Sequence, residues 1–133
     1  MAHRVLIMMG SESDRERMEK AVPILKDAGV ETEVVVSSAH RDPDRTAELA
    51  RTAKEKGFSV VICGAGLSAA LPGVVAAHTK LPVIGVPLSA ALGGLDALLS
   101  IAQMPPGVPV ACVGIDNAKN AAHLALRIMG LAH

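Results

Sequence analysis

Apolar residues in this chain of 133 residues gather in five short runs, and each run is followed by a segment with helical spacing. The runs predict strands over 5–9, 31–36, 59–63, 81–86 and 108–113. They are nearly continuous in Val, Ile, Leu and Met, which is typical of strands covered on both faces. The pattern therefore predicts an α/β protein whose parallel sheet lies between two layers of helices.

The segments between the runs carry signals for helix ends. Ser13 and Glu16 have the spacing of a capping box, and the helix that they begin is expected to end at Gly29. Asp42 and Pro43 are a good N-cap and first-turn pair for the next helix. Shorter apolar patterns predict three further helices over 74–78, 95–101 and 117–129.

Strands that alternate with helices in this way predict a three-layer, flavodoxin-like sandwich with a five-stranded parallel sheet of order 2-1-3-4-5. No internal repeat, low-complexity tract or linker divides the sequence, so we expect a single domain over 1–133. In such sheets the ligand crevice lies outside the carboxyl ends of the strands, where the strand order reverses. Here that point falls between strands one and three.

The loops after the first four strands consist mainly of Gly, Ser, Ala and Pro, with Asp14, His40 and Arg41 among the charged exceptions. Imidazole, with an ordinary pKa of about 6.5, both donates and accepts a proton near neutral pH. Arginine presents a planar cation that fits phosphate or carboxylate. A lone His-Arg pair also fits a helix cap or a solvated loop. Because the other loops converge on the same edge of the sheet, we favour a catalytic role for this pair.

Two further loops have the composition of ligand-binding segments. The turn over 10–13 offers backbone N–H groups and the hydroxyls of Ser11 and Ser13, which suit a phosphate, although they also suit a plain helix cap. Asp14 either accepts hydrogen bonds from ribose hydroxyls or complements a helix dipole. The Gly-Ala-Gly segment over 64–66 either lets a flat ligand approach the backbone or forms a tight turn with positive φ.

Composition excludes several functional classes. Thirteen basic and thirteen acidic residues cancel, so no overall field steers the protein onto nucleic acid or an anionic membrane. Phe58 is the single aromatic residue, which argues against stacking on bases or on a flavin. A phospho-receiver domain requires acidic residues at the ends of the first and third strands, and these two predicted strands do not end in acidic residues.

Cysteine and histidine usage predicts neither a disulfide nor a metal site. Cys63 and Cys112 lie in apolar runs and are expected to be reduced core residues, and the five histidines lack metal-ligand spacing. No run approaches the ~18 apolar residues of a membrane span, and the first run is too short for a signal peptide. We therefore expect a cytoplasmic protein without a bound metal.

Seven blocks of sequence, spread over almost the whole chain, carry a family resemblance. They read GSESD (10–14), SAHRDP (38–43), GAG (64–66) with LPG (71–73), LPVIGVP (81–87), GLDALLSIAQMP (94–105), GVPVA (107–111) and NAKNA (117–121). In this set and in this order they resemble the PurE family of purine biosynthesis.

The resemblance implies an enzyme that makes 4-carboxy-5-aminoimidazole ribonucleotide without metal, biotin or ATP, and that assembles as a homo-octamer. Most bacterial and archaeal members are mutases that move the carboxylate of N(5)-carboxyaminoimidazole ribonucleotide to ring carbon C4. It also implies that His40 is the catalytic residue. The implied contacts to this small-molecule ribonucleotide substrate come from Ser11, Ser13, Asp14, Ser38, Ala39, Arg41 and the backbone of Gly64, Ala65, Gly66 and Leu67.

A second branch of the family carboxylates aminoimidazole ribonucleotide directly with CO2. Ala70 stands where bacterial mutases commonly have a histidine, and the stretch over 68–71 is closer to the direct carboxylases. Arg41 and the LPG, QMP and GVP blocks match the mutases. We expect a mutase, with direct carboxylation and a non-catalytic nucleotide-binding module as the alternatives.

Overall fold

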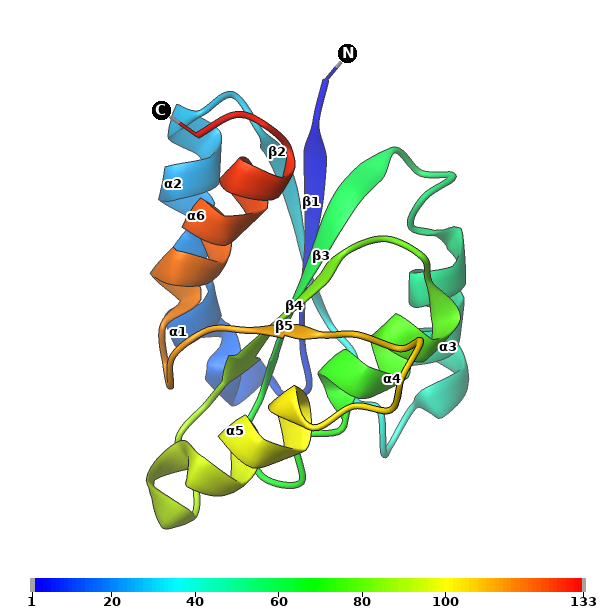
Figure 1. Ribbon diagram of the computed structural model, residues 1–133, viewed down its shortest axis with the longest axis vertical. Coiled ribbons are helices and arrows are strands. Elements are labelled where there is room, and N and C mark those ends of the chain that lie inside the picture. Colours follow the sequence, from blue (N-terminus) through cyan, green and yellow to red (C-terminus); the bar gives the residue numbers. More distant parts are fainter. Residues whose placement is uncertain (1, 133) are drawn as a thin grey trace.

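The computed structural model describes residues 2–132 as a parallel sheet between two helical layers (Figure 1). The five strands are β1 (Arg4–Met9), β2 (Glu31–Val36), β3 (Phe58–Ala65), β4 (Val83–Pro87) and β5 (Ala111–Cys112). The helices are η1 (Glu12–Asp14), α1 (Arg15–Met18), α2 (Ala21–Asp27), α3 (Pro43–Thr52), α4 (Leu71–His78), η2 (Leu92–Gly94), α5 (Leu95–Ala102) and α6 (Ala118–Ile128). The strand order β2-β1-β3-β4-β5 confirms the predicted flavodoxin-like fold.

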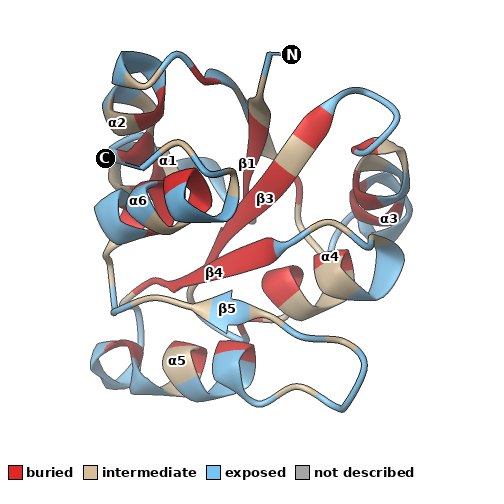
Figure 2. Ribbon diagram, turned by 45° about the horizontal axis from the view of Figure 1, so that its top comes forward, coloured by how far each residue is buried: buried red, intermediate tan, exposed pale blue. Residues whose placement is uncertain are grey.

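Strand β1 lies at the centre of two separate cores. Val5, Ile7 and Met9 point to one face of the sheet, where they pack with residues of α1, α2 and α6. Leu6 and Met8 point to the other face, which α3, α4 and α5 cover. All five side chains are at most 2 % exposed, and the middle strands are red in Figure 2. Side chains that carry chemistry must therefore come from the ends of the strands.

The first predicted helix is two helices, α1 and α2. Pro23 lies in the first turn of α2, where its ring and missing N–H are incompatible with a helical bond to the carbonyl of Glu19. The chain turns more tightly there, and the N–H of Val22 donates to that carbonyl at 3.0 Å. The helical spacing was read correctly, but the proline divides the segment.

The predicted capping box of Ser13 and Glu16 is wrong. The chain enters the short helix η1 before α1, and the hydroxyl of Ser11 accepts the N–H of Ser13 at 3.3 Å. At α3 the predicted boundary is confirmed, because Pro43 is its first residue, but the Asp42 side chain makes no capping hydrogen bond.

β3 and β5 differ most in length from the prediction, while β1 begins one residue earlier and β4 covers 83–87 instead of 81–86. β3 continues through Gly64 and Ala65, which we expected in a loop. β5 has two residues rather than six and pairs with β4 alone. Pro109, which has no N–H to donate, lies in the segment predicted as strand, and this limits the ladder on that edge.

Two hydroxyls are buried beneath the loop that carries His40. Ser37 and Thr46 are 2 % and 0 % exposed, and their side-chain oxygens lie 2.7 Å apart. The Thr46 hydroxyl donates to the carbonyl of Ser38 at 3.2 Å, so it accepts the Ser37 hydroxyl. Because buried hydroxyls are costly without partners, this pair ties the end of β2 firmly to α3.

Arg17 on α1 joins three loops at the carboxyl edge of the sheet. Its guanidinium donates to the carboxylates of Asp14 and Asp116 and to the carbonyl of Ser89, each at 3.0 Å. Asp116 also accepts the N–H of Ser89 at 2.9 Å and its hydroxyl at 2.5 Å. Partial burial by itself would raise the pKa of Asp116, but the Ser89 hydrogen bonds and the Arg17 charge together hold its pKa below the ordinary value.

Replacing Thr46 by Val is expected to lower the free energy of unfolding by about 1–3 kcal/mol, because the Ser37 hydroxyl then stays buried without a partner. Urea denaturation measures the change. In the double variant Ser37→Ala, Thr46→Val, no hydroxyl remains at the site, and the Ser38 carbonyl still accepts the N–H of Asp42 at 2.9 Å. The double variant should therefore recover stability. A double variant that is less stable than Thr46→Val would contradict this account.

The lowered pKa of Asp116 predicts a pH-dependent contribution to stability. Its charged form stabilises the fold fully above the ordinary value of 3.8, and this contribution is lost as the pH falls through the lowered folded-state pKa. Asn tolerates the φ of 58° at this position. We therefore expect Asp116→Asn to lower Tm at neutral pH, with a smaller difference from the parent at about pH 3. Circular dichroism melts at both pH values measure this, and a difference that stays constant argues against it.

Candidate active site

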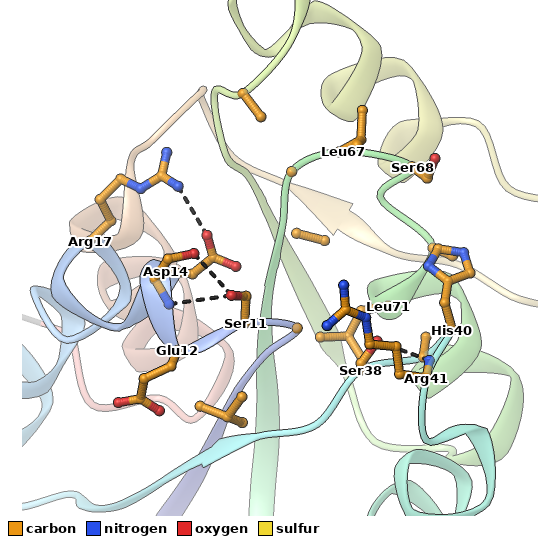
Figure 3. A pocket seen from close by; sticks show the side chains of 18 residues that line it. Ser11, Glu12, Asp14, Arg17, Ser38, His40, Arg41, Leu67, Ser68 and Leu71 are labelled. Carbon is orange, nitrogen blue, oxygen red and sulfur yellow. Dashed lines mark hydrogen bonds and ion pairs between the residues drawn. The ribbon is translucent and has the colours of Figure 1, made fainter.

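A cavity of about 590 Å³ opens where the strand order reverses, between the carboxyl ends of β1 and β3 (Figure 3). Its walls come from the turn, η1 and α1 that follow β1, from the last residues of β2 and β3 with the loops after them, from the start of α4, and from one residue after β4. The lining residues are Gly10, Ser11, Glu12, Ser13, Asp14, Arg17, Val36, Ser38, Ala39, His40, Arg41, Ala65, Gly66, Leu67, Ser68, Ala70, Leu71 and Ala90.

All of the predicted site residues except Gly64 line this cavity. Figure 3 shows Ser11 and Asp14 on one side of it and His40 and Arg41 on the other. Residues that are distant in the sequence meet here because parallel strands bring their carboxyl ends to one edge of the sheet. The structure thus places a proton carrier, a cation, hydroxyls and a carboxylate around one space.

Gly64 has a packing role below the cavity. It is buried in β3, and a Cβ added there would lie 2.3 Å from the sulfur of Met18. Gly66 lines the cavity, and a Cβ there would lie 3.2 Å from the carbonyl oxygen of Leu88. Neither glycine has positive φ, so the alternative of a tight left-handed turn is wrong. Within 64–68 the positive φ is that of Ser68, at 48°.

The turn after β1 presents polar groups to the cavity. The hydroxyls of Ser11 and Ser13 are 2.9 Å apart and exposed, so both remain open to a ligand. Glu12 is bonded to Arg15, and this hydrogen bond lowers the pKa of the Glu12 carboxyl below its ordinary value. Asp14 is 14 % exposed, and its carboxylate is bonded to Arg17. The turn therefore combines exposed hydroxyls with one carboxylate of fixed orientation.

The loop after β2 presents His40 and Arg41, which are both exposed. Ser38 shapes this loop, because its hydroxyl accepts the N–H of Arg41 at 3.1 Å and its carbonyl accepts the N–H of Asp42 at 2.9 Å. Within residues 2–132 the His40 ring has no hydrogen-bond partner. Its two nitrogens are thus available to exchange a proton with a ligand in the cavity.

Sequence reasoning missed several residues of the cavity wall. Arg17 follows Asp14 by three positions, a spacing that brings two side chains together on a helix and could have identified it. Ala70 and Leu71 reach the cavity because α4 begins three residues earlier than predicted. Ser68 gave no such signal, because its exposure follows from the path of the loop after β3.

The described residues offer neither a thiolate nor a metal site. Cys63 and Cys112 are free; Cys63 is buried, whereas Cys112 is only half-buried, at the edge of its core. Burial raises the pKa of both thiols, and neither lines the cavity. No group of three His, Cys, Asp or Glu side chains within 2–132 is placed to hold a metal ion, and His133 lies outside the described residues. None of the described helices is long and apolar enough to span a membrane.

Comparisons with known proteins agree with this site. The family model of AIR carboxylase matches residues 4–133. The N5-carboxyaminoimidazole ribonucleotide mutase of Pyrococcus abyssi is 59% identical over 131 residues, which are 98% of this chain and 75% of that protein. The phosphoribosylaminoimidazole carboxylase of Saccharomyces cerevisiae is 54% identical over 125 residues, 93% of this chain and 22% of that protein.

A solved structure shares the fold over nearly the whole chain. The crystal structure of Treponema denticola PurE superposes with a TM-score of 0.82 at 31% identity, covering 98% of this chain and 82% of that one. Three findings indicate the same family: the family-model match over residues 4–133, the identity to these relatives, and the shared fold. The chain belongs to the AIR carboxylase family, the PurE family that its seven sequence blocks resemble.

Proposed function

We propose that the protein converts N(5)-carboxyaminoimidazole ribonucleotide to 4-carboxy-5-aminoimidazole ribonucleotide, a step of de novo purine biosynthesis, without a metal or other cofactor. One observation carries the proposal: a single cavity places His40 and Arg41 opposite the Ser11 and Asp14 side of the site. Relatives that are 52–59% identical bear the name of this mutase. The reaction needs a proton carrier and a ribonucleotide site, and the cavity supplies groups for both.

The side chains divide between the parts of the substrate. Arg41 and the hydroxyls of Ser11 and Ser13 suit the phosphate, since charge-assisted and hydroxyl donors bind its oxygens. Asp14, as a charged carboxylate, only accepts hydrogen bonds and therefore suits the ribose hydroxyls. Small residues such as Gly66 leave room for the imidazole base.

In the reaction, His40 acts first as an acid and then as a base. Protonated His40 donates to the exocyclic nitrogen as the N–CO2 bond breaks, and the bonding electrons stay on that nitrogen. Aminoimidazole ribonucleotide and CO2 then share the cavity, and C4 attacks the CO2 carbon. Neutral His40 takes the proton from C4, which restores the aromatic ring and the starting form of the enzyme. One imidazole suits both steps because its ordinary pKa lies near neutrality.

The intermediate CO2 must be retained between the two steps. Ala39, Ala65, Ala70 and Leu71 give part of the cavity wall an apolar character. Such a wall offers water few hydrogen-bonding partners, which favours capture of CO2 by C4 over loss to solvent.

Direct carboxylation of aminoimidazole ribonucleotide is the second candidate. Overall identity does not separate the two, since the Saccharomyces cerevisiae carboxylase is 54% identical to this chain and the Thermotoga maritima mutase is also 54% identical. Arg41 favours the mutase, whereas Ala70, which also lines the cavity, favours the carboxylase. The sequence blocks around them favour the mutase overall.

We expect His40→Asn to reduce conversion of N(5)-carboxyaminoimidazole ribonucleotide at least about 100-fold, the usual contribution of a general acid or base. Its affinity for the ribonucleotide should change little, since Asn keeps polar atoms of similar size. Arg41→Ala is the contrasting variant, and it should weaken binding by about 2 kcal/mol through loss of a charge-assisted contact. Product formation and calorimetric titration measure the two effects.

Supplying the two substrates separately decides between the candidates. Rapid turnover of aminoimidazole ribonucleotide with CO2, and none of the carbamate, would replace the mutase by the carboxylase. Binding without conversion of either compound would leave a non-catalytic nucleotide-binding module. If His40→Asn turns over like the parent, His40 carries no chemistry.

We further infer that copies of the chain assemble, as the homo-octamer that the family resemblance implies. Leu92, Leu95 and Leu99 are 78%, 54% and 49% exposed, and the spacing of four residues places Leu95 and Leu99 on one face of α5, with Leu92 in the preceding η2. An exposed apolar surface of this kind is typical of an interface. Leu95→Glu should lower the mass in sedimentation, whereas Leu95→Met should not, and an unchanged mass for both variants would exclude this surface.

The proposal includes no macromolecule other than copies of the chain. The balanced charge supports a small-molecule ribonucleotide rather than nucleic acid or a membrane as the ligand. Free Cys63 and Cys112 support a reducing compartment, the cytoplasm.

A further inference from the structure

Asp14 offers one free carboxylate oxygen to the cavity. Its Oδ1 accepts Nη2 of Arg17 at 3.0 Å, and no donor among the described residues contacts Oδ2. Figure 3 shows Arg17 reaching Asp14 from the side away from His40. A carboxylate held through one oxygen has its other oxygen aimed before a ligand arrives, which reduces the entropy lost on binding.

Arg17 is itself fixed by groups outside the loop that carries Asp14. Its Nη1 donates to the carbonyl of Ser89 and to Oδ1 of Asp116, both at 3.0 Å. A free arginine samples many rotamers, and ordering it on binding costs conformational entropy. Because Ser89 and Asp116 hold the guanidinium in the folded protein, substrate binding does not have to order it.

Asp116 lies behind Arg17 and does not line the cavity. Its oxygens accept Arg17 and both donors of Ser89, so it also fixes the loop that brings Ala90 to the cavity wall. Asp14, Arg17 and Asp116 together carry a net negative charge. The carboxylate of Asp14 is therefore better suited to the neutral ribose hydroxyls than to the phosphate itself.

We propose that Asp116 and Arg17 are positioning residues, which hold the Asp14 carboxylate and the loop beside it in the orientation that accepts the ribose hydroxyls. The inference rests on the proposed function, because that function assigns the ribose to Asp14. The ribose does not react, so this contact is made equally in the bound substrate and in the transition state. Its loss raises KM and leaves kcat nearly unchanged.

Asp116→Asn is the first test, since Asn tolerates the φ of 58° and retains an acceptor for the N–H of Ser89. We expect KM to rise about tenfold, as for loss of one charge-assisted contact, with kcat within about twofold. In an Asp14→Asn background the same substitution should have no further effect on KM. The matched control is Arg51→Gln, which removes an exposed i,i+3 pair with Glu48 on α3 and should leave KM unchanged.

Three outcomes would overturn the inference. The first is an unchanged KM in Asp116→Asn. The second is an effect of Asp116→Asn on KM that persists in the Asp14→Asn background, because persistence means that Asp116 acts through the fold. A lower KM in Asp116→Asn would mean that the freed Arg17 binds phosphate directly. If Asp116→Asn does not fold, Asp116→Gly and Arg17→Gln replace it, because glycine also accepts the positive φ.

Calorimetric binding of aminoimidazole ribonucleotide separates this inference from the proposed function. A parent protein that binds the ribonucleotide without turning over refutes the proposed function, and the Kd values of the same variants then still test the coupling of Asp116 to Asp14. A parent that turns over, together with variants of unchanged KM, refutes the positioning role alone.

Discussion

The burial of β1 on both faces and both edges is the constraint on which the rest of the structure depends. Its side chains from Val5 to Met9 are at most 2 % exposed, and β2 and β3 take its backbone hydrogen bonds on either side. The buried part of this strand, from Val5 to Met9, has no room for a polar side chain. The chemistry of the protein is therefore confined to the residues that follow the strand ends, where the chain turns back toward the surface.

This constraint explains why the fold and the location of the site could be predicted from the sequence. Continuous apolar runs with helical segments between them leave few topologies, and the reversal of strand order then marks the crevice. His40, Arg41 and Asp14 stood out because they are charged residues in loops of otherwise small side chains. The strand order and the placement of these three around one cavity depend on pattern and topology alone, without any detail of side-chain packing.

Features that depend on pairs of distant side chains could not be read from the sequence. Arg17 and Asp116 are 99 positions apart in the sequence, and no local pattern in either segment predicts their contact. The role of Gly64 depends on Met18, whose sulfur occupies the space that a side chain there would need. The spacing of Ser13 and Glu16 favoured Ser13 as the helix cap, whereas the path of η1 gives that role to Ser11. Such choices are made by packing and loop geometry, which local pattern does not specify.

The two outer strands of the sheet limit how copies of this chain can meet. β5 has only two paired residues and is preceded by Pro109, which cannot donate a backbone hydrogen bond to a new neighbour. At the opposite border, β2 exposes the charged side chains of Glu31 and Glu33. Neither border is a good template for another strand, so edge-to-edge fusion of sheets from different molecules is disfavoured. Any contact between copies therefore depends on side chains rather than on strand pairing, and continued strand pairing is what builds fibrous aggregates.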